Sequence, residues 1–141
     1  MAIATRTLKD TAIATGSGAA GGKVTVLVNM NDNTTADSLV VDASGLTGHA
    51  NGAKLDITRI WWGLVQGTAD DNTGWVSLYF EGDTDVTAIN LVGTGHYDGT
   101  AGKIENSVTN TGATSGDIKL SAFGTSGYVL IELRKDSAFT A

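Results

Sequence analysis

The sequence contains neither cysteine nor proline. Without cysteine, the chain forms no disulfide and offers no thiolate to a metal ion. Without proline, every backbone N–H along the chain can take part in strand pairing. Glycine, by contrast, occurs 19 times, and its access to positive φ angles suits tight turns. Together these features favour a β-structure rich in turns over a helical one.

Long apolar runs and helical periodicity are also missing. No apolar stretch approaches the roughly 18 residues of a membrane span, and the first ten residues lack the apolar core of a signal peptide. A length of 141 residues with 41% hydrophobic and 17% charged residues indicates one folded domain. The net charge of −6 disfavours binding to nucleic acid or an anionic membrane and allows docking onto a basic surface.

Alternation of apolar and polar residues predicts seven strands, separated by turns rich in Gly, Asp, Asn and Thr. This pattern is typical of an antiparallel β-sandwich, and we predict an all-β, jelly-roll-like fold. The predicted strands are Lys23–Met30, Ser38–Asp42, Lys54–Gln66, Trp75–Glu81, Val86–Val92, Asp117–Phe123 and Tyr128–Lys135.

The N-terminal segment has the pattern of an eighth strand, Ala2–Lys9, and a hinge rich in Gly and Ala, Gly16–Gly22, follows it. We therefore predict two parts, a flexible arm with its hinge (residues 1–22) and the sandwich domain (residues 23–141). A flexible tether lets the arm fold onto its own sheet or reach a neighbour. The weakly patterned segment Tyr97–Gly116, with a short strand at Lys103–Val108, is expected to be a functional or mobile loop.

No set of residues matches a known catalytic or cofactor site. Gly16, Gly18 and Gly21 fit a G-x-G-x-x-G pattern, but they precede a strand, whereas dinucleotide binding needs a helix after the glycines. His49 and His96 lie beside glycines in predicted turns, without the partners of a hydrolytic triad or a zinc site. We therefore expect no enzyme activity, no cofactor and no metal ion.

Two acidic clusters leave alternatives open. Asp70, Asp71 and Asn72 form one, and Asp83 and Asp85 form the other, in positions where Ca²⁺ can collect oxygen ligands. Glu81 with Asp83 or Asp85 could also form a glycosidase carboxylate pair. Asp and Asn are, however, common turn formers through local hydrogen bonds, and we favour that interpretation.

Aromatic residues give the strongest indication of a binding surface. In Trp75–Glu81, Val76, Leu78 and Phe80 are expected to face inward, which turns Trp75 and Tyr79 outward. Strict alternation in Lys54–Gln66 places Leu55, Ile57, Trp61 and Val65 on one face and Ile60, Trp62 and Leu64 on the other. We predict one apolar patch of Trp62, Trp75 and Tyr79 on neighbouring strands. Such a patch is typical of a protein interface, while cover by a loop and stacking of sugar rings are the alternatives.

Several of these features resemble the decoration (cement) proteins of tailed bacteriophage capsids. They are the arm Ala2–Lys9, the hinge Gly16–Gly22, the run DITRIWWG at 56–63 and a small, acidic chain without Cys or Pro. Phage tail-fibre and adhesin domains have a similar composition, so a carbohydrate-binding or adhesin module is the alternative.

The resemblance implies a non-enzymatic virion protein, assembled in the host cytoplasm, that forms a homotrimer on the capsid surface and bridges subunits of the major capsid protein. It implies no nucleic-acid or membrane partner. The interface residues that we predict are Ile3, Thr5 and Leu8 of the arm, together with Trp62, Trp75 and Tyr79.

Overall fold

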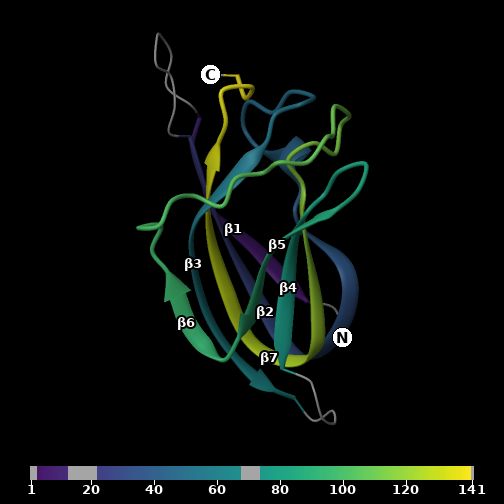
Figure 1. The fold of residues 1–141 in the computed structure, drawn as a ribbon, viewed down its shortest axis with the longest axis vertical. Coiled ribbons are helices and arrows are strands. Elements are labelled where there is room, and N and C mark those ends of the chain that lie inside the picture. The colour runs from purple at the N-terminus through teal and green to yellow at the C-terminus, as the bar shows by residue number, and fades with distance from the viewer. Residues whose placement is uncertain (1–2, 13–21, 68–73, 141) are drawn as a thin grey trace.

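The computed structural model describes residues 3–12, 22–67 and 74–140, and all strand pairings in these ranges are antiparallel (Figure 1). The predicted all-β antiparallel sandwich is confirmed; its jelly-roll topology stays a prediction. One short 3₁₀ helix, Ala43–Gly45, follows the second strand. The strands are β1 (Ala4–Asp10), β2 (Lys23–Val41), β3 (Leu55–Gln66), β4 (Trp75–Phe80), β5 (Val86–Val92), β6 (Thr94–Tyr97) and β7 (Ile118–Lys135).

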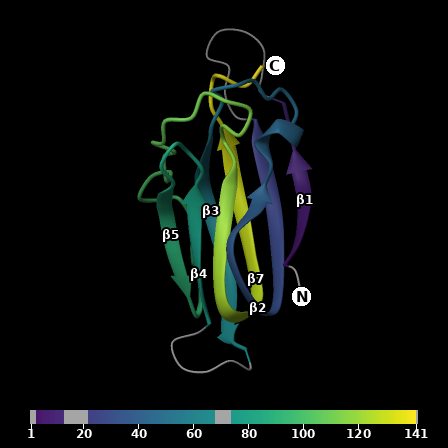
Figure 2. The ribbon, with the colours of Figure 1, turned by 90° about the vertical axis from the view of Figure 1, so that its right-hand side faces the viewer.

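A long ribbon of β2 and β7 forms the frame of the fold. The two strands pair from Lys23 opposite Arg134 at one end to Val41 opposite Ile118 at the other. Midway the ribbon bends back on itself, so that its halves lie in two layers (Figures 1 and 2). One layer has the order β1-β2-β7-β3-β6, and in the other β4 pairs with β7 and β5 with β4.

The prediction that each of these long strands is two separate strands was wrong. The breaks expected at 31–37 and at 124–127 are bends within continuous strands. On β2, register shifts occur between Met30 and Ser38, and Asp32 and Asp37 have φ angles of 52° and 50°. On β7, Gly127 has a φ of 128°, and a Cβ at this position would overlap the carbonyl oxygen of Gly63. Bulges and positive-φ residues bend a ribbon without ending its pairing.

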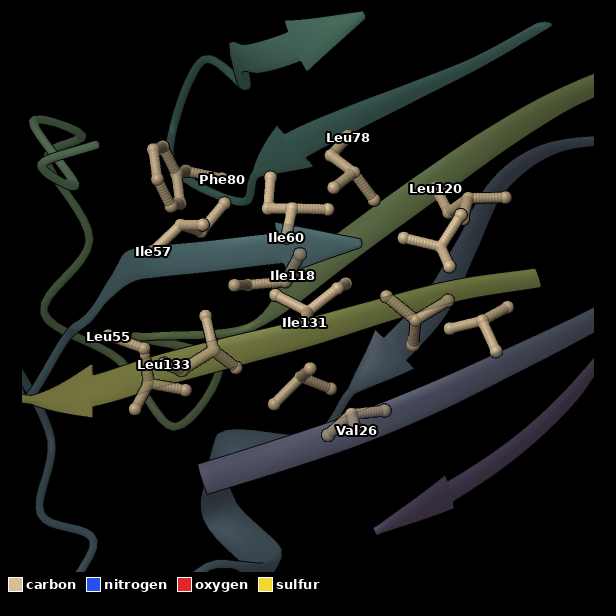
Figure 3. Packing of buried hydrophobic residues seen from close by; sticks show 14 of the residues in the cluster. Val26, Leu55, Ile57, Ile60, Leu78, Phe80, Ile118, Leu120, Ile131 and Leu133 are labelled. Carbon is tan, nitrogen blue, oxygen red and sulfur yellow. The ribbon is translucent and has the colours of Figure 1, made fainter. Parts of the chain in front are cut away.

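The core lies between the two layers (Figure 3). Because the ribbon folds over, the apolar faces of its two halves meet, and β3 and β4 add their own apolar residues to opposite sides of the core. The largest fully buried apolar side chains are Leu55, Ile57, Ile60, Leu78, Phe80, Leu91, Ile118, Leu120, Ile131, Leu133 and Phe139.

The segment that joins β6 to β7 is tied to the sheets by hydrogen bonds. Its predicted strand is reduced to one isolated bridge between Ile104 and Ile57. Lys54 donates from Nζ to the carbonyl oxygen of Val108 (2.6 Å), and the backbone N–H of Asn106 donates to Asp56 Oδ1 (2.9 Å). The short strand β6, which the sequence analysis missed, pairs with β3 through residues 94–97.

We expect Gly127→Ala to lower the free energy of unfolding by about 2–4 kcal/mol, because it strains a positive-φ position and collides with Gly63. Gly45→Ala is the control, since a Cβ at Gly45 meets no atom within 4 Å. Chemical denaturation measures both. Equal stabilities of the two variants would show that the bend does not depend on Gly127.

Candidate interaction surfaces

The predicted arm lies on its own sheet. β1 pairs with the first half of β2, from Ala4 opposite Asn29 to Asp10 opposite Val24, so the chain folds the arm back. Ile3 is partly buried against the core, and Leu8 lies at a register shift with 52% of its surface exposed. Thr5 is exposed and lines a cleft of about 400 Å³. This cleft separates β1 from the second half of β2. The other residues that line it are Thr7, Leu39, Val40, Val41, Asp42, Gly45 and Leu46.

A buried lysine fastens the end of β1 to the rest of the molecule. The side chain of Lys135 is fully buried, and its Nζ donates to Asp10 Oδ1 (2.5 Å) and to the carbonyl oxygens of Thr11 (2.9 Å) and Thr47 (2.7 Å). The ammonium also lies 5.4 Å from the centre of the Phe139 ring. All three N–H donors are therefore satisfied, as a buried ammonium requires.

The same contacts shift the pKa of the Asp10 carboxyl. Burial acts to raise its pKa, but hydrogen bonds from Lys135 and Thr47 outweigh burial and hold the pKa below its ordinary value. A lowered pKa in the folded state contributes stability above the ordinary pKa, and that stability is lost as the pH falls through the folded-state value.

We expect Asp10→Ala to cost about 3–5 kcal/mol, because it leaves the buried ammonium of Lys135 without its counter-charge. Hydrogen exchange should show early loss of protection in β1, and denaturation should show the loss of stability. Lys9→Ala, at an exposed neighbouring position, is the control. A variant at Asp10 as stable as that control would contradict the role of this ion pair.

The side chains of β3 after residue 57 point to the opposite faces from those predicted, relative to Leu55 and Ile57, because the strand contains a bulge. The register with β7 shifts between Ile57 and Arg59, so strict alternation fails there. As a result Trp62 faces the interior, where its Nε1 donates to the carbonyl oxygen of Val92 (3.0 Å). Its ring lies against Gly95 on β6. Trp62 is therefore not an outward anchor.

Trp75 and Tyr79 are half-buried between the core positions of β4, which agrees with the predicted alternation. The ring of Trp75 stacks on Phe123, with centroids 4.1 Å apart and planes 18° apart. Val92, the partner of Trp75 on β5, is 72% exposed.

The single predicted patch does not form. β3 and β4 are not paired, and Trp62 faces inward and donates to the backbone of Val92 on β5, whereas Trp75 and Tyr79 point outward from β4. Even within β4, a polar row divides the two aromatic residues, since Ser77 lies between them and donates to Asn90 Oδ1 (2.6 Å). The outer face of this sheet therefore carries an aromatic cluster of Trp75, Phe123 and Val92, with Tyr79 further along β4.

The two histidines occupy different environments. His49 lies in a turn, with Nε2 3.1 Å from the carbonyl oxygen of Ser115 and its ring edge-on to Phe139. The prediction that His96 lies in a turn was wrong, because it is part of β6 and pairs with Trp61.

The acidic clusters show turn chemistry where the structure describes them. Asp85 Oδ1 accepts from the backbone N–H of Gly82 (3.2 Å), and its Oδ2 lies 3.3 Å from Lys119 Nζ. Among residues 3–12, 22–67 and 74–140, no three His, Cys, Asp or Glu side chains form a group that could hold a metal ion. The other acidic cluster (70–72) and the glycines at 16, 18 and 21 lie outside these ranges.

A buried carboxyl, Asp117, was missed by the sequence analysis. Its Oδ1 accepts from the backbone N–H of Ala43 (2.8 Å), which joins the start of β7 to the turn after β2. Burial raises the pKa of Asp117 to about 6; the hydrogen bond from Ala43 acts against burial, and the neighbouring carboxyls of Asp42 and Glu81 add to the rise. Because its folded-state pKa lies above the ordinary value, the folded protein takes up this proton before the unfolded chain does. This group therefore makes the fold more stable as the pH falls from about 6 toward about 4.

We expect Asp117→Asn to be more stable than the original chain at pH 7, by roughly 1–3 kcal/mol, because the amide removes a buried charge and keeps its acceptor for Ala43. The difference should shrink on lowering the pH below about 6. Thermal unfolding across this pH range measures it, with Asp83→Asn in an exposed turn as the control. A stability difference that stays the same at every pH would contradict the raised pKa of Asp117.

No protein-family model, curated protein or solved structure matches this chain. The part of the chain that the structure describes contains no helix long and apolar enough to cross a membrane.

Proposed function

We propose that this chain is a non-enzymatic virion protein, a capsid decoration protein that binds across neighbouring subunits of a phage major capsid protein as a homotrimer. The proposal is supported by the sequence features that resemble this family. It is also supported by the all-β fold, whose two outer sheet faces carry aromatic and aliphatic side chains.

The observation that carries the proposal is the aromatic cluster on the outer face of the second layer. Trp75 and Phe123 stack there, and Val92 beside them is the most exposed large apolar residue of the described chain. Large aromatic residues at the centre of an apolar surface contribute most of the binding energy of many protein interfaces. We assign this cluster, together with Tyr79, to the contact between copies.

Binding of this kind requires no bond chemistry. Each contact removes apolar surface from water, and the exposed edge of β1 offers backbone groups for pairing with a further strand. Leu8 and Thr5, on or beside that edge, are the arm residues placed to meet a neighbour. Ile3 contributes to the core instead.

Deleting the whole arm would not test this proposal cleanly. Removal of residues 1–15 would take away Asp10 and leave the buried Lys135 unpaired, so that the fold itself would be damaged. Leu8→Asp changes the exposed edge and leaves the ion pair in place.

We expect light scattering to give a molar mass of three times 14.4 kDa, and the protein to co-sediment with undecorated shells of the phage that encodes it. Trp75→Ser together with Tyr79→Ser should weaken trimer formation by about 30-fold or more, the effect of losing a central aromatic anchor. Trp61→Ser, on the outer face of the other layer, is the matched control for trimer formation. Failure of the original chain to bind shells, as monomer or trimer, would refute the proposed function.

A further inference from the structure

The outer face of the five-stranded layer carries a continuous apolar row across its three central strands. Leu27 of β2 pairs with Leu130 of β7, and Leu130 pairs with Trp61 of β3. Leu27 and Leu130 each lie between fully buried core residues, and Trp61 lies between buried Ile60 and inward-facing Trp62, so all three point away from the core, and each is half-buried. Arg6 on β1 and His96 on β6 end the row. The shift of register in β3 is what brings Trp61 to this face.

The neighbouring row extends the same surface. Tyr128 of β7 pairs with Gly63 of β3, and its ring lies where a side chain of Gly63 would stand, since a Cβ would come within 2.8 Å of the ring. Tyr128 is 40% exposed. The ring therefore lies across the sheet beside Trp61 and Leu130 and makes a broad apolar centre.

Positive charge gathers at one end of this face. Lys9, Arg59 and the partners Lys23 and Arg134 occupy the rows next to Leu27 and Leu130, and all four are exposed. Glu132 lies among them, 3.8 Å from Lys23 and 3.9 Å from Arg59. With Arg6, the face holds five of the nine Lys and Arg residues of a chain whose net charge is −6.

The other four cationic side chains are bound within the molecule. Lys54 Nζ donates to Val108, Lys103 pairs with Asp56, Lys119 pairs with Glu81 and Asp85, and Lys135 pairs with Asp10. The cations that remain available to a partner therefore lie on one face of an otherwise acidic protein.

We propose that this face binds the protein partner of the chain, and that the partner presents carboxylates around an apolar side chain seated over Trp61 and Leu130. The inference rests on the proposed function and names the chemistry of the shell surface that the protein would recognise. Within a contact, nearby charges dominate over the net charge, because salt screens interactions beyond about 10 Å. The cations at the end of the apolar rows would set the register of the partner.

A protein partner fits this face better than a nucleic acid does. The carboxylate of Glu132 stands among the cations, where a phosphate backbone would be repelled. The aliphatic side chains of Leu27 and Leu130 fill the row that a nucleic-acid site would give to stacking aromatic residues. A polyanion would also meet the acidic remainder of the molecule, whereas a small group of carboxylates would not.

The test uses a fluorescent random copolymer of glutamate and tyrosine as an acidic, partly apolar probe, with fluorescence anisotropy as the readout. We expect saturable binding that weakens with salt, with weaker binding of polyglutamate, which lacks apolar side chains. Unlabelled oligothymidylate should compete poorly. Stronger competition by oligothymidylate than by the unlabelled copolymer would overturn the proposal in favour of a nucleic acid.

Charge variants locate the site. Arg59→Gln with Arg134→Gln should weaken binding about tenfold, because two desolvated cation–carboxylate contacts are lost. Thr84→Glu with Thr87→Glu makes the same change in net charge on exposed residues near or on β5 and should have little effect. Equal weakening by the two pairs would mean that only net charge matters, and would overturn the proposal.

Two further variants separate the contribution of the apolar centre to binding from that of the charges. Trp61→Ser should lose affinity through the apolar centre, and circular dichroism checks that it folds. Glu132→Gln should bind the copolymer more tightly, since it removes the carboxylate that partly neutralises Lys23 and Arg59. Unchanged or weaker binding by the Glu132 variant would contradict the placing of the partner's carboxylates.

The same variants distinguish this inference from the proposed function. If the original chain binds shells and the Arg59 and Arg134 variant binds them equally well, this face is not the docking surface, although the proposed function stands. If the original chain binds the copolymer in the expected pattern but binds no shell, the face is confirmed as a site for acidic protein and the capsid assignment fails.

Discussion

The pairing of β2 with β7 is the constraint on which the rest of the structure depends. Every other strand attaches to this ribbon directly or through one neighbour: β1 to β2, β3 and β4 to opposite halves of β7, β6 to β3 and β5 to β4. Because the ribbon bends in the middle, one apolar alternation fills the core from both layers (Figure 3). The opposite face of each strand is turned to the outside by the same bend, so both outer surfaces follow from it.

A sandwich built in this way presents two large faces that point in opposite directions (Figure 2). One carries the stacked pair of Trp75 and Phe123, and the other carries Trp61, Leu130 and Tyr128 beside a group of cations. A protein that joins other subunits needs at least two separate contact surfaces. In the proposed function two chemically different faces would meet that need, since one suits apolar contact between copies and the other an acidic partner.

Alternation in the sequence was enough to place most strands and to turn Trp75 and Tyr79 outward, because that information is local. It could not show that β2 continues through residues 31–37, where polar residues look like a turn. It also could not show the bulge between Ile57 and Arg59, and a shift of one residue moves every later side chain to the other face. Trp62 was chosen as an anchor and Trp61 was passed over for that reason. The burial of Lys135 depends on Asp10, which lies 125 positions away in the chain, so no local pattern predicts it.

Net charge likewise could not predict where charged side chains gather on the surface. A value of −6 allows docking onto a basic surface, yet it is a sum that carries no information on where the charges lie. The strand register decides which side chains lie next to one another on the surface. It brings Lys9, Lys23, Arg59 and Arg134 from four strands to one end of the same layer. Glu132 contacts two of these cations at the long distances of 3.8 and 3.9 Å, where an exposed ion pair contributes little stability. Asp56, the partner of Arg134 on β3, is already paired with Lys103, and Glu132 only partly offsets Lys23 and Arg59, so the face keeps the positive charge that the chain as a whole lacks.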